Sequence, residues 1–251
     1  ITTTSQATYS ASDARKLTNV SNIANIEVGS LVEGNGEGRE IYVRSKNVGS
    51  QEIELNAPLY AAEGTQNYTF RRFQYMIDFS GFSKLSKFIM SDIEFQCNNL
   101  SSGIMLAPSG PTFELQDCFV SRPKNRGLTS IGGGCQGLLV DRCQFLSSEE
   151  SDDVADRVTI AMNVNSNDVK LRDCRATQFR HFAVLAGQNH LVMGNHFFQG
   201  DGVSGAARTA GIVLQDNFTA SVISGNYIDN CFVEWTNERD PTPQFSTGFS
   251  F

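Results

Sequence analysis

Short runs of alternating apolar and polar residues recur along the chain, and none of them has a helical period. One recurring run has an apolar pair, a small polar residue, Cys or Asn, and then an aromatic or aliphatic residue. Its copies begin at Phe88, Phe113, Leu138, Val169, Leu191 and Val222. A second apolar run precedes most copies by about ten residues, at 103, 127, 158, 181 and 211. The pattern predicts short strands separated by Gly, Asn and Asp turns.

The spacing of these copies predicts the fold. Ile93, Cys118, Cys143, Cys174, His196 and Tyr227 are taken as equivalent, at intervals of 25, 25, 31, 22 and 31 residues. Asn195 and Asn226 are the alternative equivalents for the last two positions. A strand this short cannot bury its apolar face alone, whereas equivalent strands stacked ~4.8 Å apart share one core. We therefore expect an all-β solenoid, a parallel β-helix with about 25 residues per coil.

Equivalent side chains of such a stack lie in columns. Cys118, Cys143 and Cys174 are expected to form one buried column of small fillers at a bend. Asn195 and Asn226 each follow a glycine, which suits a turn whose side chain hydrogen-bonds the neighbouring coil.

The chain is expected to have four segments. Residues 1–25 are rich in Ser, Thr and Asn and are interpreted as an irregular leading segment or linker. Residues 26–74 are expected to form a small β unit, and residues 75–238 the coils. Residues 239–251 contain two prolines and are expected to lead out of the stack into a longer chain.

Composition narrows the range of partners. The net charge is −7 and the pI about 5.0, with no basic stripe, so nucleic acid is not expected as a partner. The sequence contains no run of 18 apolar residues, so membrane insertion is not expected. The six cysteines contain no Cys-x-x-Cys pair, so we expect no metal site and no cofactor. Free buried thiols are expected, in a protein made in a reducing cytoplasm.

Several segments resemble a known superfamily. They are the Gly-Asn-x-Ile and Asp-Cys copies, Tyr-Met-Ile-Asp-Phe-Ser-Gly at 75–81, and the segments at 27–59 and 223–238. The chain resembles the pectate-lyase-like right-handed, single-stranded parallel β-helix superfamily. It is most similar to tail-spike and tail-fibre proteins of phages, prophages and gene transfer agents. The resemblance implies a homotrimer within a phage-like tail or virion, assembled in the bacterial cytoplasm. It also implies contact with bacterial surface polysaccharide and with other tail or baseplate proteins.

A complete catalytic site is not evident. Polygalacturonase-like members carry Asn-x-Asp, Asp-Asp, Gly-His-Gly and Arg-x-Lys motifs, and this chain has only Asp152-Asp153. That pair lies in an acidic loop with Glu149 and Asp156. These four residues are candidates for a paired-carboxylate site, in which one acid protonates a glycosidic oxygen and the other activates water. The alternative is a solvated loop.

The two long intervals predict a groove. Extra residues at about 147–157 and 199–210 are expected to leave the stack at one angular position, on either side of one coil that has only a short connection. This groove, ~10 Å wide, would have Gln178, Arg180 and His181 on its floor. Its walls would carry the acidic loop on one side and Asp201 and Arg208 on the other.

Three functions remain open. The first is adhesion, as a tail-spike or tail-fibre shaft that binds surface polysaccharide without cleaving it. The second is depolymerisation, as a glycosidase or polysaccharide lyase with carboxylates in the groove. The third is a purely structural trimeric connector.

Overall fold

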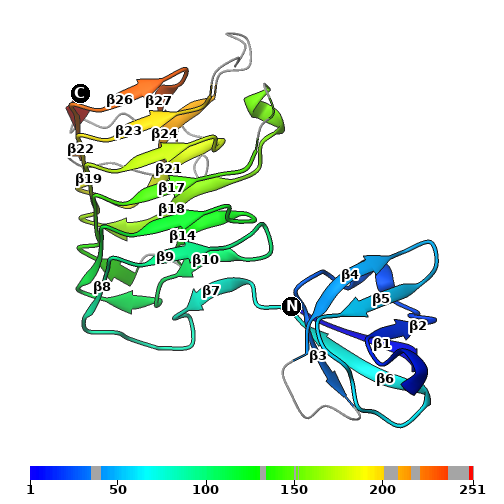
Figure 1. Cartoon of the computed structure of the whole chain (residues 1–251). Helices are drawn as coiled ribbons and strands as arrows, with labels where there is room; N and C mark the ends of the chain where they lie inside the picture. Colours follow the sequence, from blue (N-terminus) through cyan, green and yellow to red (C-terminus); the bar gives the residue numbers. More distant parts are fainter. Residues whose placement is uncertain are drawn as a thin grey trace. The chain divides into compact units, whose positions relative to one another are not determined.

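The computed structural model describes residues 1–34, 41–130, 134–149, 151, 153–200, 209–215, 221–236 and 249–250. These residues are all-β, as predicted, and contain no α-helix. The chain divides into two compact units, Ile1–Gln74 and Tyr75–Phe251, and each has its own hydrophobic core (Figure 1). Three single turns of 3-10 helix occur, η1 (Ala11–Asp13), η2 (Ile23–Asn25) and η3 (Val154–Asp156).

The first unit is an antiparallel sheet with the strand order β3-β6-β1-β2-β5-β4. Its strands are β1 (Thr2–Tyr9), β2 (Lys16–Thr18), β3 (Leu31–Gly34), β4 (Val43–Asn47), β5 (Glu52–Leu55) and β6 (Gly64–Arg71). A bridge between Leu31 and Tyr42 joins the two ends of this order, with Val32 N–H donating to the Ile41 carbonyl at 2.8 Å. The sheet is therefore closed into a barrel, which leaves few strand edges unpaired.

The prediction of an irregular segment at residues 1–25 is wrong. β1 pairs with β6 along its whole length and turns Ser5, Ala7 and Tyr9 toward the barrel interior. Two of these three inward residues are small, so the apolar alternation of the strand is weak in the sequence. The barrel core also contains Leu17 of β2 and Ile53 of β5.

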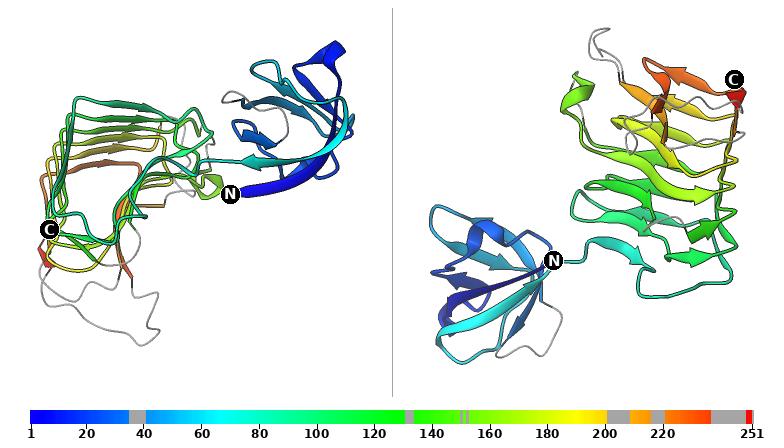
Figure 2. Two further views of the ribbon diagram at one scale, coloured as in Figure 1. Left: turned by 90° about the horizontal axis from the view of Figure 1, so that it is seen from below. Right: turned by 180° about the vertical axis from the view of Figure 1, so that it is seen from behind.

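The second unit consists of three parallel sheets. The chain contributes one strand to sheet I, one to sheet II and one to sheet III, and then repeats this order, and we call each such set a coil. Successive coils stack in register, and their strands lie one behind another when viewed along the stack (Figure 2, left). The second unit begins at Tyr75, the residue at which the coils were expected to begin.

Each sheet takes one strand from almost every coil. Sheet I contains β7 (Tyr75–Asp78), β10 (Ser102–Met105), β14 (Arg126–Thr129), β18 (Ile160–Asn167), β21 (His181–Ala186), β24 (Ala210–Gln215) and β27 (Phe232–Thr236), with the short strands β11 (Ser109–Gly110) and β15 (Gly134–Gln136) beside them. Sheet II contains β8 (Phe88–Ser91), β12 (Phe113–Gln116), β16 (Leu139–Asp141), β19 (Lys170–Arg172), β22 (Leu191–Met193), β25 (Ser221–Ser224) and β28 (Phe249–Ser250). Sheet III contains β9 (Glu94–Gln96), β13 (Phe119–Ser121), β17 (Gln144–Leu146), β20 (Arg175–Thr177), β23 (His196–Phe198) and β26 (Tyr227–Asp229).

The three sheets enclose one apolar core. Leu115, Val140, Leu171 and Val192 follow one another in a column of sheet II and are fully buried. Sheets I and III contribute similar columns to the same cluster. Because each inward residue lies above its equivalent in the next coil, the core is continuous along the stack.

The expected exit segment at 239–251 lies outside the described residues, except for β28. The two residues of β28 pair in parallel with β25, so they belong to sheet II and do not leave the stack.

Candidate functional site

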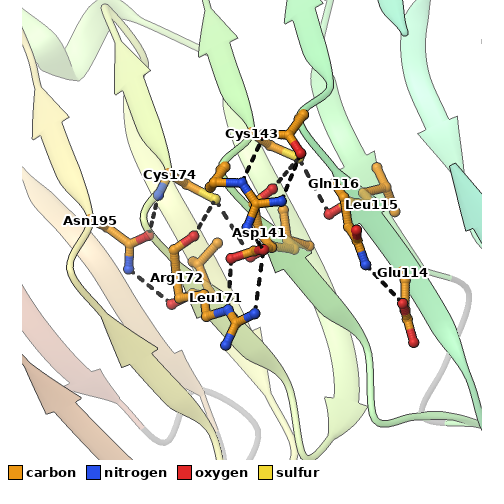
Figure 3. A network of polar contacts seen from close by, with 12 residues as sticks. Glu114, Leu115, Gln116, Asp141, Cys143, Leu171, Arg172, Cys174 and Asn195 are labelled. Atoms are coloured by element: carbon orange, nitrogen blue, oxygen red, sulfur yellow. Dashed lines mark hydrogen bonds and ion pairs between the residues drawn. The ribbon is translucent and has the colours of Figure 1, made fainter. Parts of the chain in front are cut away.

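The bend between sheets II and III holds the column of cysteines and asparagines. The strand register makes Cys118, Cys143, Cys174, Asn195 and Asn226 equivalent. Each side chain donates to a backbone carbonyl of the preceding coil. The acceptors are Met90 at 3.7 Å, Leu115 at 3.5 Å, Val140 at 3.5 Å, Leu171 at 3.0 Å and Val192 at 2.9 Å, in that order. The column therefore ties neighbouring coils together (Figure 3).

The residue before each member of this column has a left-handed backbone. Its φ is 52° at Asp117, 49° at Arg142, 52° at Asp173 and 67° at Gly194. Asp, Asn and Gly tolerate this conformation best, which explains the Asp-Cys and Gly-Asn pairs of the sequence. The Arg142 guanidinium donates to Asp117 at 2.7 and 2.9 Å and holds the pKa of that carboxyl below its usual range. The side chains of Asp117 and Arg142 therefore stabilise the bend and are not available for catalysis.

The thiols of the second unit are not poised as nucleophiles. No disulfide occurs among the six cysteines, and all but Cys231 are buried. Burial raises the pKa of Cys97 and of Cys135 to about 11. Both thiols therefore stay protonated near neutral pH.

The corner between sheets III and I carries the two long connections. Leu146, Thr177 and Phe198 are equivalent at the end of sheet III, and Ile160, His181 and Ala210 at the start of sheet I. The connections 147–159 and 199–209 therefore leave the same corner and flank the short connection 178–180. Asp152, Asp201 and Arg208 of the predicted groove walls lie outside the described residues.

Glu149 is used within its own connection. Its carboxylate accepts from the backbone N–H groups of Val158 at 2.8 Å and Thr159 at 2.9 Å, and from the Thr159 hydroxyl. Arg157 is buried and donates to the carbonyls of Ser151 at 2.7 Å and Gln199 at 2.5 Å. Glu149 thus holds this connection in shape and is not available as a general acid or base. Asp153 precedes η3, Asp156 is its last residue, and both are exposed.

Gln178, Arg180 and His181 lie at the predicted floor. Gln178 has a φ of 64°, and its N–H donates to the Phe198 carbonyl at 2.9 Å. The backbone N–H of Arg180 donates to the Thr159 carbonyl at 3.0 Å, and the Arg180 guanidinium donates to the Arg157 carbonyl at 3.5 Å. The backbone of the short connection is therefore fixed by the coils on both sides.

His181 has a defined tautomer. Its Nδ1 lies 2.6 Å from the Ala210 carbonyl, which can only accept, so Nδ1 carries the hydrogen. Burial lowers the pKa of this imidazole, which favours the neutral form. In that form Nε2 is a hydrogen-bond acceptor at the outer face of sheet I.

Two further polar residues of this face were missed in the sequence. Arg126 is equivalent to Ile160 and therefore to His181, and Asn163 lies on the strand between them. The apolar runs at 127, 158 and 181 were recognised as strands. Aligning these runs would have brought Arg126 and Asn163 beside His181.

The other two histidines do not join this group. His190 is buried at the start of β22, and His196 is on sheet III, where its ring lies 4.8 Å from that of Tyr227. Among the described residues, no group of three or more His, Cys, Asp or Glu side chains could hold a metal ion.

The first unit has a hollow of its own. A pocket of about 430 Å³ is lined by charged residues of both signs, among them Asp13, Lys16, Lys46 and Glu54. Lys46 donates to the carbonyls of Ile23, Ala24 and Ile26 at 2.5 to 3.3 Å, so its ammonium is bound to the backbone of the barrel. In the described parts of both units, no helix is long and apolar enough to cross a membrane.

Comparison with known proteins adds no assignment to this geometry. No protein-family model matches the chain, and no curated protein matches its sequence.

Proposed function

We propose that the second unit is a right-handed, single-stranded parallel β-helix, and that it is the shaft of a tail spike or tail fibre of a phage-like particle. Its role is adhesion, through contact with bacterial surface polysaccharide. Three parallel sheets with equivalent residues in columns are the arrangement that such a helix requires. The homotrimer and its tail partners are part of this proposal and derive from the sequence resemblance.

One observation carries the proposal of glycan contact. Two long connections flank a short one at the corner between sheets III and I, and the outer face of sheet I begins there. A polysaccharide is long and polar, and it suits a track of polar side chains along the stack better than an enclosed pocket. Arg126, Asn163 and His181 offer donors and acceptors along this track.

Adhesion is favoured over cleavage because two of the acidic side chains already accept hydrogen bonds within the protein. Glycoside hydrolysis needs two carboxyl groups facing one glycosidic bond. Glu149 already accepts three hydrogen bonds, and Asp117 is bound by Arg142. The described part of the loop leaves only Asp153 and Asp156 as exposed carboxylates.

The test is to incubate the purified protein with surface polysaccharide from candidate host bacteria. Binding is followed by retention on immobilised polysaccharide, and chain length by size-exclusion chromatography of the products. Binding without shortening is expected. Absence of both binding and shortening on all host polysaccharides would refute glycan contact and leave the structural connector.

Depolymerisation is the second candidate, favoured by the exposure of Asp153 and Asp156 on the connection beside His181. If chains are shortened, Asp156→Asn should reduce the rate at least about 100-fold, as expected for loss of an acid–base group. Asp168→Asn is the matched control, because Asp168 is also exposed but lies at a different bend, between sheets I and II. Equal rates for the two variants would exclude a catalytic Asp156.

A further inference from the structure

The outer face of sheet I has two columns of outward side chains. The first column contains Tyr75, Ser102, Arg126, Ile160, His181, Ala210 and Phe232. The second contains Asp78, Met105, Thr129, Asn163, Val184, Val213 and Glu234. In the first column the long polar side chains of Tyr75, Arg126 and His181 occupy every second strand, about 10 Å apart. Shorter residues lie between them.

Arg126 is a half-buried cation without a carboxylate partner among the described residues. In the part of the chain that the structure describes, its Nη1 donates to two backbone carbonyls, of Asn125 at 3.0 Å and of Val158 at 3.1 Å. Burial lowers the pKa of this guanidinium, because partial removal from water disfavours the charged form. Arg72, Arg142 and Arg172 are all paired with carboxylates. A cation removed from water is normally paired with an anion, so Arg126 lacks the usual counter-charge.

The acidic residues of this face are at its edges. Asp78 is on β7 and Glu234 on β27, the first and last strands of the sheet. The outward positions of the five strands between them hold no carboxylate. Glu149, on the adjacent connection, has both oxygens bound to Val158 and Thr159. Among the described residues, the middle of the face therefore offers a positive charge with no carboxylate at the outward positions beside it.

The neighbours of Arg126 are arranged for a hydroxylated ligand. Asn163, on the next strand, has a side-chain amide with no hydrogen bond to any described residue. His181, one strand further, presents Nε2 as an acceptor, as argued above. Ile160, Val184, Ala210 and Val213 form an apolar cluster beside them. This cluster lowers the local dielectric and so strengthens a charged contact.

We propose that the outer face of β14, β18 and β21 binds an acidic group of a surface glycan. Arg126 takes the oxyanion, a carboxylate or a phosphate, and Asn163 and His181 hydrogen-bond hydroxyls of the sugar units beside it. This inference rests on the proposed function and adds to it the chemical class of the ligand. It also predicts that one acidic group is recognised per site, because Arg126 is the one cation at the outward positions of β14, β18 and β21 in the described part of the chain.

The experiment compares Arg126→Gln with Arg175→Gln in the full chain. Arg175 is exposed on sheet III, so its replacement makes the same charge change on another face. The probes are host polysaccharide in native form, after chemical reduction of its carboxyl groups, and after removal of its phosphate. Arg126→Gln should weaken binding of the native polymer at least about tenfold, as expected for loss of a charge-assisted hydrogen bond. Arg175→Gln should change it less than twofold.

The modified polymers identify the acidic group. Removing the recognised group should weaken wild-type binding as much as Arg126→Gln does, with no further loss when the two changes are combined. Binding that survives both modifications and Arg126→Gln would overturn this inference and leave glycan adhesion intact. Equal losses for the two arginine variants would also overturn it, in favour of unspecific attraction. Failure of the wild type to bind any of the polymers would overturn both proposals.

A stability measurement separates binding from a structural role. A desolvated cation held for a ligand costs the free protein stability, so Arg126→Gln should leave the melting temperature unchanged or raise it. Arg126→Lys keeps the charge but loses the forked geometry, and should bind with intermediate strength. A lowered melting temperature for both variants, with unchanged binding, would assign Arg126 to the fold alone.

Discussion

Asn195 connects three coils through one side chain. Its Oδ1 accepts from the Cys174 N–H at 2.9 Å, and its Nδ2 donates to the Leu171 carbonyl at 3.0 Å. On the other side, Nδ2 and the Asn195 N–H both donate to Oδ1 of Asn226, at 2.9 and 3.0 Å. A cysteine at the same position donates only weakly and offers no strong acceptor. Asparagine is therefore the stronger link in this column.

Replacing Asn195 with alanine tests that link. Asn195→Ala leaves the Cys174 N–H and the Leu171 carbonyl buried without partners, and should lower the free energy of unfolding by about 3 kcal/mol. Cys143→Ala is the matched control and should cost about 1 kcal/mol, since it removes one small buried group. Urea denaturation measures both. Equal losses would mean that the asparagine acts only by filling space.

His190 makes the second unit sensitive to acid. Burial lowers its pKa from 6.5 to about 4, and the Ala186 carbonyl and the Asp168 carboxylate act in the opposite direction. His190 therefore binds a proton below about pH 6.5 in the unfolded chain, but only below about pH 4 in the folded chain. Stability falls as the pH falls through this window, by about 3 kcal/mol between pH 7 and pH 4.

His190→Leu should remove this part of the pH dependence. The measurement is the free energy of unfolding at pH 7 and pH 4 for both proteins. The drop between the two pH values should be about 3 kcal/mol smaller in the variant, because leucine has no proton to take up. An unchanged drop would mean that His190 is protonated alike in the folded and unfolded chains.

At the scale of the strands, glycine permits the close approach of β10 and β14. A Cβ at Gly103 would lie 2.1 Å from the Gly127 carbonyl oxygen of the next coil. Gly103→Ala should therefore push the two strands apart and cost about 2–3 kcal/mol. Gly81→Ala is the control, since a Cβ there meets nothing within 4 Å and the change should stay within about 0.5 kcal/mol. Thermal unfolding of both variants gives the comparison, and similar melting temperatures would contradict the steric argument.

The strands of the second unit were predictable because their register repeats. Cys118, Cys143 and Cys174 mark one bend, and the parallel pairing observed on both sides of them follows from that spacing. The sequence left Asn195 and His196 as alternatives for the next position. The sequence alone did not decide between these two adjacent residues. The hydrogen bonds of the Asn195 amide decide the matter.

The barrel strand β1 and the role of Arg126 were not predictable in the same way. β1 is held by its ladder to β6, a partner more than fifty residues away, and its inward residues are mostly small. Arg126 precedes an apolar run and looks like any solvated charge in the sequence. Its role depends on the lack of a facing carboxylate among the described residues, and this becomes visible only when the strands of sheet I are placed side by side.

At the scale of the whole molecule, two cores imply two folding units. The core of the first unit contains Leu17, Ile53 and Phe70, and that of the second contains Phe113, Phe145 and Phe182. The clusters share no residue. Each unit has enough buried apolar surface to unfold as a cooperative block.

The single tryptophan makes this separation measurable. Trp235 packs against the core of the second unit, so its fluorescence reports the unfolding of that unit alone. Phe70→Ala empties part of the barrel core and should cost the first unit about 3–5 kcal/mol, while the fluorescence midpoint in urea stays in place. Phe145→Ala should lower that midpoint, because Phe145 is buried in the second core. If Phe70→Ala also moved the fluorescence midpoint, the barrel and the stacked sheets would unfold as one body. Mutations in either unit would then change the stability of the glycan face on sheet I.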